Sequence, residues 1–460
     1  MKLSKGVRET FTKLLTELAR TFKVWKDDPI AFFQNETRDS LIFPCIDSPY
    51  DLMKEISEKR DGNKPCIYQL YHTLYSQSLV KELAVFLHKV TPSCLQYELK
   101  PIIEAIAYEY INSDLDGFTQ TVIYDEKLFD VQFQTLEKIV NRRITTFTKE
   151  FDHFVYQFPV TIFNLSDEIK LSKNILLKPI HENVLTEKQL ELYKDTRSFN
   201  YNYYLEIFVP IKCSEKLSLK LAEKARDATY NLLKLLATRL SPKAIPLVAS
   251  NDRSRHRFDF HTSGKDKANT SISTTHRFHS FQADSKQFWQ AFNKERTSEN
   301  NLIDTSFMIP ELLLTPNFSS QRVVDRMERA LIWYGDASTE PNYYQQIQKL
   351  VSSIESIVNY RERDLTETFK RRVTHLHITH NGLSKSVEDK AAKLYKARSY
   401  IVHGSSIDER LDYCIVDFCS ETLIRAIYYI SQFGFEETGF NNKLPKFLDD
   451  LPIRAKLQCD

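Results

Sequence analysis

The sequence predicts a multidomain α+β protein that is predominantly helical. Its 460 residues suffice for about two to four domains. Hydrophobic residues make up 42% of the chain and aromatic residues 12%, which is typical of packed cores rather than of disorder. Apolar residues recur at helical spacing near both ends of the chain, whereas the middle contains aromatic and β-branched runs that are typical of strands.

Residues 1–150 are predicted to form a mostly helical N-terminal region. Helical segments are indicated at 79–90, 99–111 and 133–147, and the run 114–117 predicts a turn. Tyrosine and phenylalanine are dense here, and we expect them to pack in a core, with a ligand- or RNA-stacking surface as the alternative. The first helix is indicated by Phe11, Leu14, Leu15, Leu18 and Phe22.

Residues 151–313 are predicted to form a mixed α/β domain, whose candidate role is that of a sensor or regulator. A long helix is expected at 215–240, and residues 301–317, with Pro310 and Pro316, are expected to link this domain to a C-terminal bundle. Strands are expected at 154–163, 175–180, 203–211, 245–249, 256–262 and 274–281.

Residues 314–435 are predicted to form this helical bundle. Its later helices are expected at 365–376, 385–402 and 412–433, and the last of these is apolar most of the way round, as in a central or interfacial helix. Residues 436–460 return to charged, proline-containing sequence, and we expect a loosely packed tail.

Composition limits the kinds of function. The 9 glycines include no Gly-rich phosphate-binding loop, and a net charge of +2 means that a nucleic-acid site must be a local patch. Seven scattered cysteines without a CxxC pair indicate a reducing compartment and no structural zinc module. Because no apolar run approaches the ~20 residues of a membrane helix, we expect a cytoplasmic protein without membrane contact.

The candidate catalytic pair lies at the end of the predicted helix 385–402. Arg398 and His403 stand five positions apart and are followed by Gly404. At about 100° per residue, Arg398 falls in the centre of the apolar stripe of this helix, where a guanidinium needs a counter-charge or an anion. A second pair, Arg372 and His377, has the same spacing, but Arg372 lies at the edge of its stripe, where solvation explains it.

The direction of the two side chains poses a geometric problem. On a continuous helix His403 would point about 140° away from Arg398, so one helix cannot aim both at the same atom. Either the helix ends near His403, with Gly404 as its stop, or the partner group comes from another subunit. The structural alternative is a core arginine paired with a carboxylate and a histidine that merely caps the helix.

Several segments then occur in a characteristic order. Residues 329–334 (Arg-Ala-Leu-Ile-Trp-Tyr) close a first helix, Glu355 lies in a second, and the helix 365–376 comes third. Residues 394–404 read Leu-Tyr-Lys-Ala-Arg-Ser-Tyr-Ile-Val-His-Gly. In these features, residues 316–433 resemble the Apea-like HEPN family, whose signature reads LYxxRSxIVHG. The resemblance covers about a quarter of the chain and implies a small helical bundle.

This resemblance implies a metal-independent endoribonuclease that acts as a dimer, with Arg398 and His403 as the catalytic pair. Histidine can move the proton of the 2′-hydroxyl or of the leaving 5′-oxygen, and arginine can hold the phosphate. The expected products carry 2′,3′-cyclic phosphate and 5′-hydroxyl ends. Glu355 would orient Arg398 or be solvated, Tyr395 of the same signature would support it, and Ser399 would bind phosphate or stabilise the helix end.

The expected partners are an RNA substrate, with tRNA among the candidates, and a second copy bound through the C-terminal bundle. Family members are associated with defence against phage, so a toxin-like effector released by a phage or cellular trigger is the implied role. No cofactor or metal is predicted. The alternative is a non-catalytic RNA-binding or adaptor protein that uses the HEPN bundle for dimerisation.

Other basic residues and histidines are weaker candidates. Arg255 and Arg257 share one face of a predicted strand beside aromatic residues, and together with Arg371 and Arg372 they are candidates for RNA contact, although a solvated strand face explains the first two as well. A metal-dependent enzyme is a third hypothesis, which would use His256, His261, His276 and His279, or His375, His377 and His380.

Overall fold

The computed structural model describes two compact units. Unit 1 comprises Met1–Asp152 with Lys212–Leu217, and unit 2 comprises His153–Ile211 with Ser218–Asp460. The described residues are 2–28, 30–31, 43–44, 71–113, 131–181, 186–188, 190–191, 201–242, 247–248, 255–263, 269–277, 285–298, 301–316, 318–340, 342–360, 363–379, 381–404 and 410–457. Together they make a predominantly helical α+β protein, as the sequence predicts.

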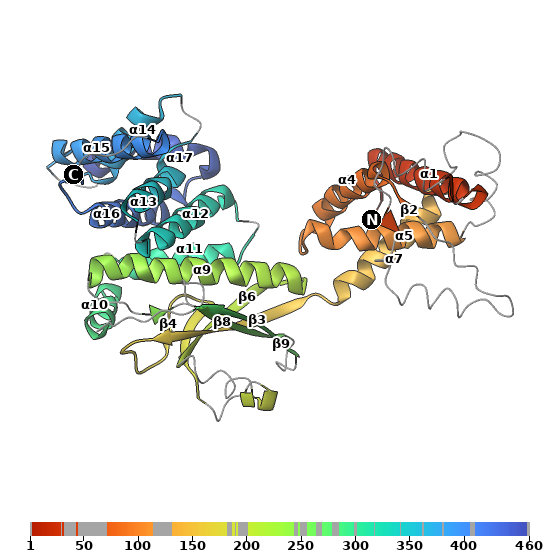
Figure 1. The fold of residues 1–460 in the computed structure, drawn as a ribbon, viewed down its shortest axis with the longest axis horizontal. Coiled ribbons are helices and arrows are strands. Elements are labelled where there is room, and N and C mark those ends of the chain that lie inside the picture. The colour runs from red at the N-terminus through yellow and green to blue at the C-terminus, as the bar shows by residue number, and fades with distance from the viewer. Residues whose placement is uncertain are drawn as a thin grey trace. The chain divides into compact units, whose positions relative to one another are not determined.

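Unit 1 consists of packed helices around a core of its own. The helical segments predicted in this region are confirmed, and the first helix buries Phe11, Leu14, Leu15 and Leu18. The side chain of Phe22 and the turn expected at 114–117 lie outside the described residues. The elements are α1 (Lys5–Asp27), β1 (Phe43–Pro44), β2 (Tyr71–His72), α4 (Leu74–Val90), a 3₁₀ turn (Gln96–Glu98), α5 (Leu99–Ser113) and α7 (Phe133–Lys149) (Figure 1).

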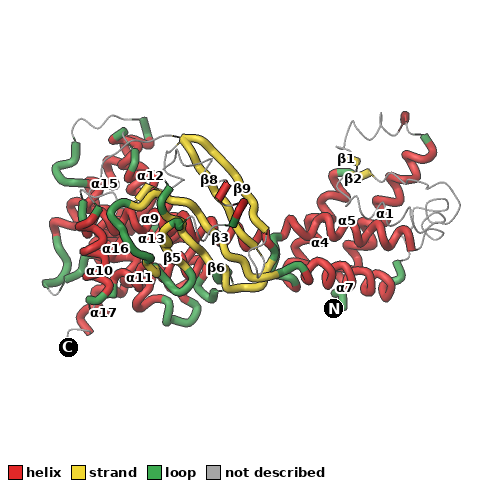
Figure 2. Tube along the Cα trace, turned by 90° about the horizontal axis from the view of Figure 1, so that it is seen from below, coloured by secondary structure: helices red, strands yellow, loops and turns green. Residues whose placement is uncertain are grey.

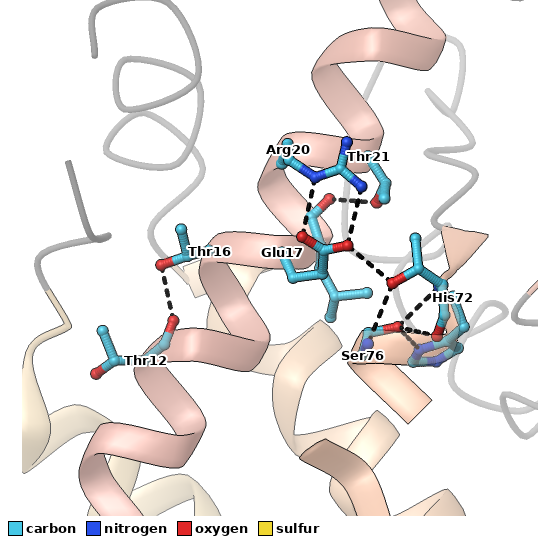
Figure 3. A network of polar contacts seen from close by, with 9 residues as sticks. Thr12, Thr16, Glu17, Arg20, Thr21, His72 and Ser76 are labelled. Atoms are coloured by element: carbon cyan, nitrogen blue, oxygen red, sulfur yellow. Dashed lines mark hydrogen bonds and ion pairs between the residues drawn. The ribbon is translucent and has the colours of Figure 1, made fainter. Parts of the chain in front are cut away.

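A polar network ties α1 to the start of α4 (Figure 3). Glu17 accepts two hydrogen bonds from Arg20, each 2.9 Å long, and one of 2.8 Å from the hydroxyl of Thr73. Thr73 and Ser76 form a reciprocal capping box, which satisfies two backbone donors at the start of α4. The His72 ring lies 3.0 Å from the Ser76 hydroxyl, and burial lowers its pKa to about 4, so this histidine is neutral at physiological pH.

Unit 2 begins with an antiparallel sheet that is covered on one face by a long helix. The strand order is β4-β5-β6-β3-β8-β9, and β7 also pairs with β3. The covering helix α9 (Glu215–Leu240) lies along this sheet (Figures 1 and 2), and its buried Arg226 stacks 4.8 Å from the centroid of the Phe158 ring. The strands are β3 (Asp152–Ile162), β4 (Ile169–Lys170), β5 (Ile175–Pro179), β6 (Tyr203–Cys213), β7 (Leu247–Val248), β8 (Arg255–Ser263) and β9 (Asn269–Arg277).

The rest of unit 2 is a bundle of helices. Its elements are α10 (Lys286–Arg296), α11 (Leu302–Leu313), α12 (Gln321–Ser338), α13 (Tyr343–Val358), α14 (Leu365–Leu376), α15 (Lys385–Val402), α16 (Ile415–Tyr429) and α17 (Phe440–Leu457), with a π-helical segment at Ile430–Gly434. The sheet domain and the bundle are joined through α9 and α12. The Tyr334 hydroxyl lies 2.7 Å from the Thr238 hydroxyl, and the Lys224 ammonium bonds Glu328 at 3.0 Å.

Two predictions for this region are wrong. The expected linker at 301–317 contains the helix α11, which buries most of its residues, including Pro310. The expected loose tail after 435 contains α17, which buries Phe440, Leu444, Phe447, Leu448 and Leu451. Prolines caused the error in both places, because a helix with a well-packed apolar face can keep a proline when packing outweighs the lost hydrogen bond.

Candidate active site

The candidate catalytic pair lies at the end of α15, and the backbone defines that end. The His403 amide donates to the Ser399 carbonyl at 3.1 Å, as in a helix, and the Gly404 amide donates to the Ile401 carbonyl at 3.1 Å. Gly404 then takes a φ of 78°, a left-handed conformation that favours glycine and stops the helix. The helix therefore ends at His403, which is the first of the two arrangements that the sequence left open.

This end does not turn His403 toward Arg398. His403 keeps a φ of −85° and a ψ of 7°, and its amide still bonds within the helix, so its side chain leaves close to the helical direction. The offset of about 140° from Arg398 therefore remains. The imidazole is exposed, and no hydrogen bond to it is found within the part of the chain that the structure describes.

Arg398 faces the bundle, where Glu355 of α13 meets it. Its Nη2 lies 3.4 Å from Glu355 Oε2, and the two side chains are 30% and 17% exposed. A single ion pair of this length leaves the guanidinium with donors for a further anion, because arginine can form two parallel bonds to a phosphate. Of the two alternatives for Glu355, the structure has the acid in contact with Arg398.

Glu355 is held in turn by Tyr395 and Asn359. The Tyr395 hydroxyl donates to Glu355 Oε1 at 3.1 Å, and the side-chain amide of Asn359 donates to the same oxygen at 3.2 Å. Burial, together with the charge of Glu355, raises the pKa of Tyr395 to about 12, so the phenol stays protonated and can donate. The Phe369 ring packs 4.8 Å from the Tyr395 ring and fixes it in the core.

Sequence reasoning missed Asn359. This residue comes directly after the last residue of α13. Its backbone N–H donates the last helical hydrogen bond, to the Glu355 carbonyl at 3.1 Å. The available signal was its position four residues after Glu355, on the same helix face, where a side-chain amide can reach the carboxylate.

The contrast that the sequence drew between the two arginines is wrong. Arg372 is 2% exposed and forms two parallel 3.0 Å bonds to Asp449 of α17, while its Nη1 donates to the Val358 carbonyl at 2.5 Å. Burial alone would raise the pKa of Asp449, but the hydrogen bonds and charges of Arg372 and Arg371 outweigh it and lower the pKa. Arg372 is therefore a core arginine and is not available to RNA in this conformation.

The remaining candidates occupy different environments. Arg371 is exposed and also pairs with Asp449, at 3.1 Å. Ser399 is partly buried, and its carbonyl rather than its hydroxyl closes the helix end. Arg255 and Arg257 lie on β8, but their side chains are outside the described residues.

The histidines do not form a ligand set among the described residues, where no three His, Cys, Asp or Glu side chains gather as they would around a metal ion. His256 pairs in register with His276 across β8 and β9, and the side chains of these strands, like residues 279 and 380, are not described. His375 and His377 are partly buried rather than exposed. The first lies 3.1 Å from the Leu448 carbonyl, and the second lies 2.8 Å from the Thr422 hydroxyl.

Comparison with known proteins adds no assignment. No family model matches the chain, and no curated protein or solved structure matches it. Within the described ranges, every helix is too short or too polar to cross a membrane.

Proposed function

We propose that the protein is a metal-independent endoribonuclease whose catalytic pair is Arg398 and His403. The observation that carries this proposal is the division of roles at the end of α15. Arg398 is positioned by Glu355 through a 3.4 Å ion pair, whereas His403 is exposed at the helix end. One group is built to hold an anion, and the other is free to exchange protons with solvent or substrate.

The proposed reaction uses the nucleophile of the RNA itself. The 2′-hydroxyl attacks the adjacent phosphorus while one imidazole removes its proton, and Arg398 stabilises the charge that grows on the phosphate oxygens. The P–O5′ bond breaks, and the leaving oxygen takes a proton from water, because each composite site holds one His403. The products carry a 2′,3′-cyclic phosphate and a 5′-hydroxyl. DNA lacks the 2′-hydroxyl and is not cut by this route.

The proposed enzyme works as a homodimer through its C-terminal bundle. Because Arg398 and His403 diverge by about 140° on one helix, a phosphate can meet both only if they come from two copies. Val402, which is 50% exposed beside this pair, supplies apolar surface for such a contact. The resemblance to the Apea-like HEPN family supports the same arrangement.

The biological role that we propose is that of a cytoplasmic, toxin-like effector in defence against phage, with tRNA among its substrates and residues 1–313 restraining it until a trigger acts. The family resemblance is the support for this role. Restraint is chemically reasonable, because an unregulated nuclease would cut the RNA of its host.

The test is RNA cleavage by the purified full-length chain in EDTA. We expect cutting of tRNA and total RNA, with 2′,3′-cyclic phosphate ends, and a loss of about 10²- to 10⁴-fold in both Arg398→Ala and His403→Ala. Lys393→Ala is the matched control, because Lys393 lies on the same helix and pairs with Asp412 at 2.8 Å. Unchanged cutting by His403→Ala would contradict the assignment, and RNA binding without cleavage would favour the adaptor.

A further inference from the structure

The exposed face of α15 carries an aromatic ring and a lysine beside His403. At about 100° per residue, Lys396 lies about 20° and Tyr400 about 60° from His403 around the helix axis. Tyr400 is 44% exposed, and the Lys396 ammonium lies 5.4 Å from the centroid of its ring. The three side chains therefore share one side of the helix, opposite the bundle that Arg398 faces.

Other charged and aromatic side chains of this region are used by the fold. Lys385 pairs with Glu388 at 3.1 Å, and Lys393 pairs with Asp412 at 2.8 Å. Tyr413, beneath the ammonium of Lys390, is partly buried, and its hydroxyl donates to the Lys390 carbonyl at 2.8 Å.

Lys396 and Tyr400 differ from these pairs. Within the described residues, Lys396 has no carboxylate partner, and the Tyr400 hydroxyl has no hydrogen bond. A large exposed ring and an uncompensated cation thus stand together without a role in folding.

We propose that Tyr400 and Lys396 form a nucleotide-binding subsite, in which Tyr400 stacks on an unpaired base and Lys396 meets a backbone phosphate. This proposal rests on the proposed nuclease function and names its substrate class. An aromatic face stacks on any base, and an adjacent cation tracks the backbone, which is the common recognition of single-stranded nucleic acid. Residues three apart on a helix are neighbours, so the stacked nucleotide lies next to His403.

The subsite selects single strands over duplexes. A base inside a duplex has both faces covered by its neighbours and cannot stack on Tyr400 without leaving the helix. Stacking reads no base edge, so the preference is for unpaired loops rather than for a particular sequence. Cleavage would accordingly fall in the loops of a structured RNA.

The test measures binding apart from cleavage. The probe is a fluorescent 12-nucleotide single strand with 2′-O-methyl groups, which offers no nucleophile, and it is titrated with the full-length chain. We expect Tyr400→Ala to raise Kd roughly 10- to 100-fold and Tyr400→Trp to bind as the wild type does. Tyr344→Ala, at a tyrosine of α13 that is 43% exposed, is the control that leaves Kd unchanged.

Salt dependence tests the lysine. Lys396→Ala should make the negative slope of log association constant against log salt concentration shallower by about 0.7, the value of one phosphate contact to a single strand. Lys393→Ala should leave this slope unchanged. A duplex of the same sequence should bind more weakly than the single strand and should not respond to Tyr400→Ala.

The outcomes separate this proposal from the nuclease itself. Unchanged probe binding by Tyr400→Ala, with His403-dependent cleavage intact, overturns the subsite alone. A Tyr400→Ala chain that sediments as a monomer where the wild type is a dimer also overturns it, because the ring is then a subunit contact. Tyr400-dependent binding without any RNA cleavage supports the subsite and contradicts the proposed nuclease function.

Discussion

The guanidinium of Arg398 is held from one side and left available on another. Glu355 contacts it, and Tyr395 and Asn359 fix Glu355 by hydrogen bonds of 3.1 and 3.2 Å. A carboxylate held in this way directs the arginine without using all of its donors. The same residues would serve a purely structural ion pair, so the exposed His403 is what gives the arrangement its proposed chemistry.

His377 offers a pH test of the bundle. Burial, reinforced by the nearby charge of Arg425, lowers its pKa to about 4. Its ring stacks 5.4 Å from Phe418, and the Thr422 hydroxyl donates to the Phe418 carbonyl, so Nε2 of the imidazole donates to Thr422. The lowered pKa keeps this imidazole neutral at pH 7.

Because the folded state binds this proton less readily than the unfolded state, its contribution to stability is complete above about pH 6.5 and is lost as the pH falls toward 4. We expect His377→Gln to remove roughly 3 kcal/mol of this pH dependence. The free energy of unfolding is measured for both chains from denaturant curves at about ten pH values between pH 4 and pH 7. Parallel pH profiles for the two chains would contradict the assignment.

At the scale of the elements, the contact between α9 and α12 is close because Gly335 has no side chain. A Cβ at this position would lie 2.0 Å from Oδ1 of Asn231, which is a buried residue of α9. This close approach lies between the same two helices that join the sheet domain to the bundle through Tyr334–Thr238 and Lys224–Glu328.

Gly335→Ala should therefore destabilise unit 2 by about 1–3 kcal/mol, as overpacking does in other cores. In the double variant with Asn231→Ala, the added methyl group finds room, so the two changes together should cost less than the sum of the single changes. Thermal unfolding of the four chains measures the coupling. Strict additivity would show that Asn231 is not the residue that Gly335 must accommodate.

The elements also show what the sequence could predict. Periodicity located α9, α14 and α15 with the bounds that the structure has, because these helices carry clear apolar stripes. It missed α17, which carries Asp449, the ion-pair partner of the buried Arg372. A helical stripe describes one helix, whereas burial depends on the helices that pack against it, which is why Arg372 was assigned to the wrong environment.

At the scale of the whole molecule, the two compact units bear on how regulation can be tested. Residues 153–313 contribute α9 and α11 to the same unit as the bundle, so a truncation at 313 removes packing partners of α12. A chain that lacks residues 1–151 but keeps β3, β6 and α9 is the more suitable variant for asking whether the N-terminal region restrains the proposed nuclease. The sequence predicted the change from helical to strand-like patterns near residue 150 but could not predict how the later parts pack together.

The central claim is that Arg398 of one copy and His403 of another act on the same phosphate. Mixing purified Arg398→Ala and His403→Ala chains, after co-refolding or prolonged exchange, tests this claim directly. Each mixed dimer would have one intact composite site, so an equimolar mixture should recover about a quarter of the wild-type RNA cleavage in EDTA. Either variant alone should remain inactive. No recovery in a mixture that demonstrably contains mixed dimers would contradict the shared site.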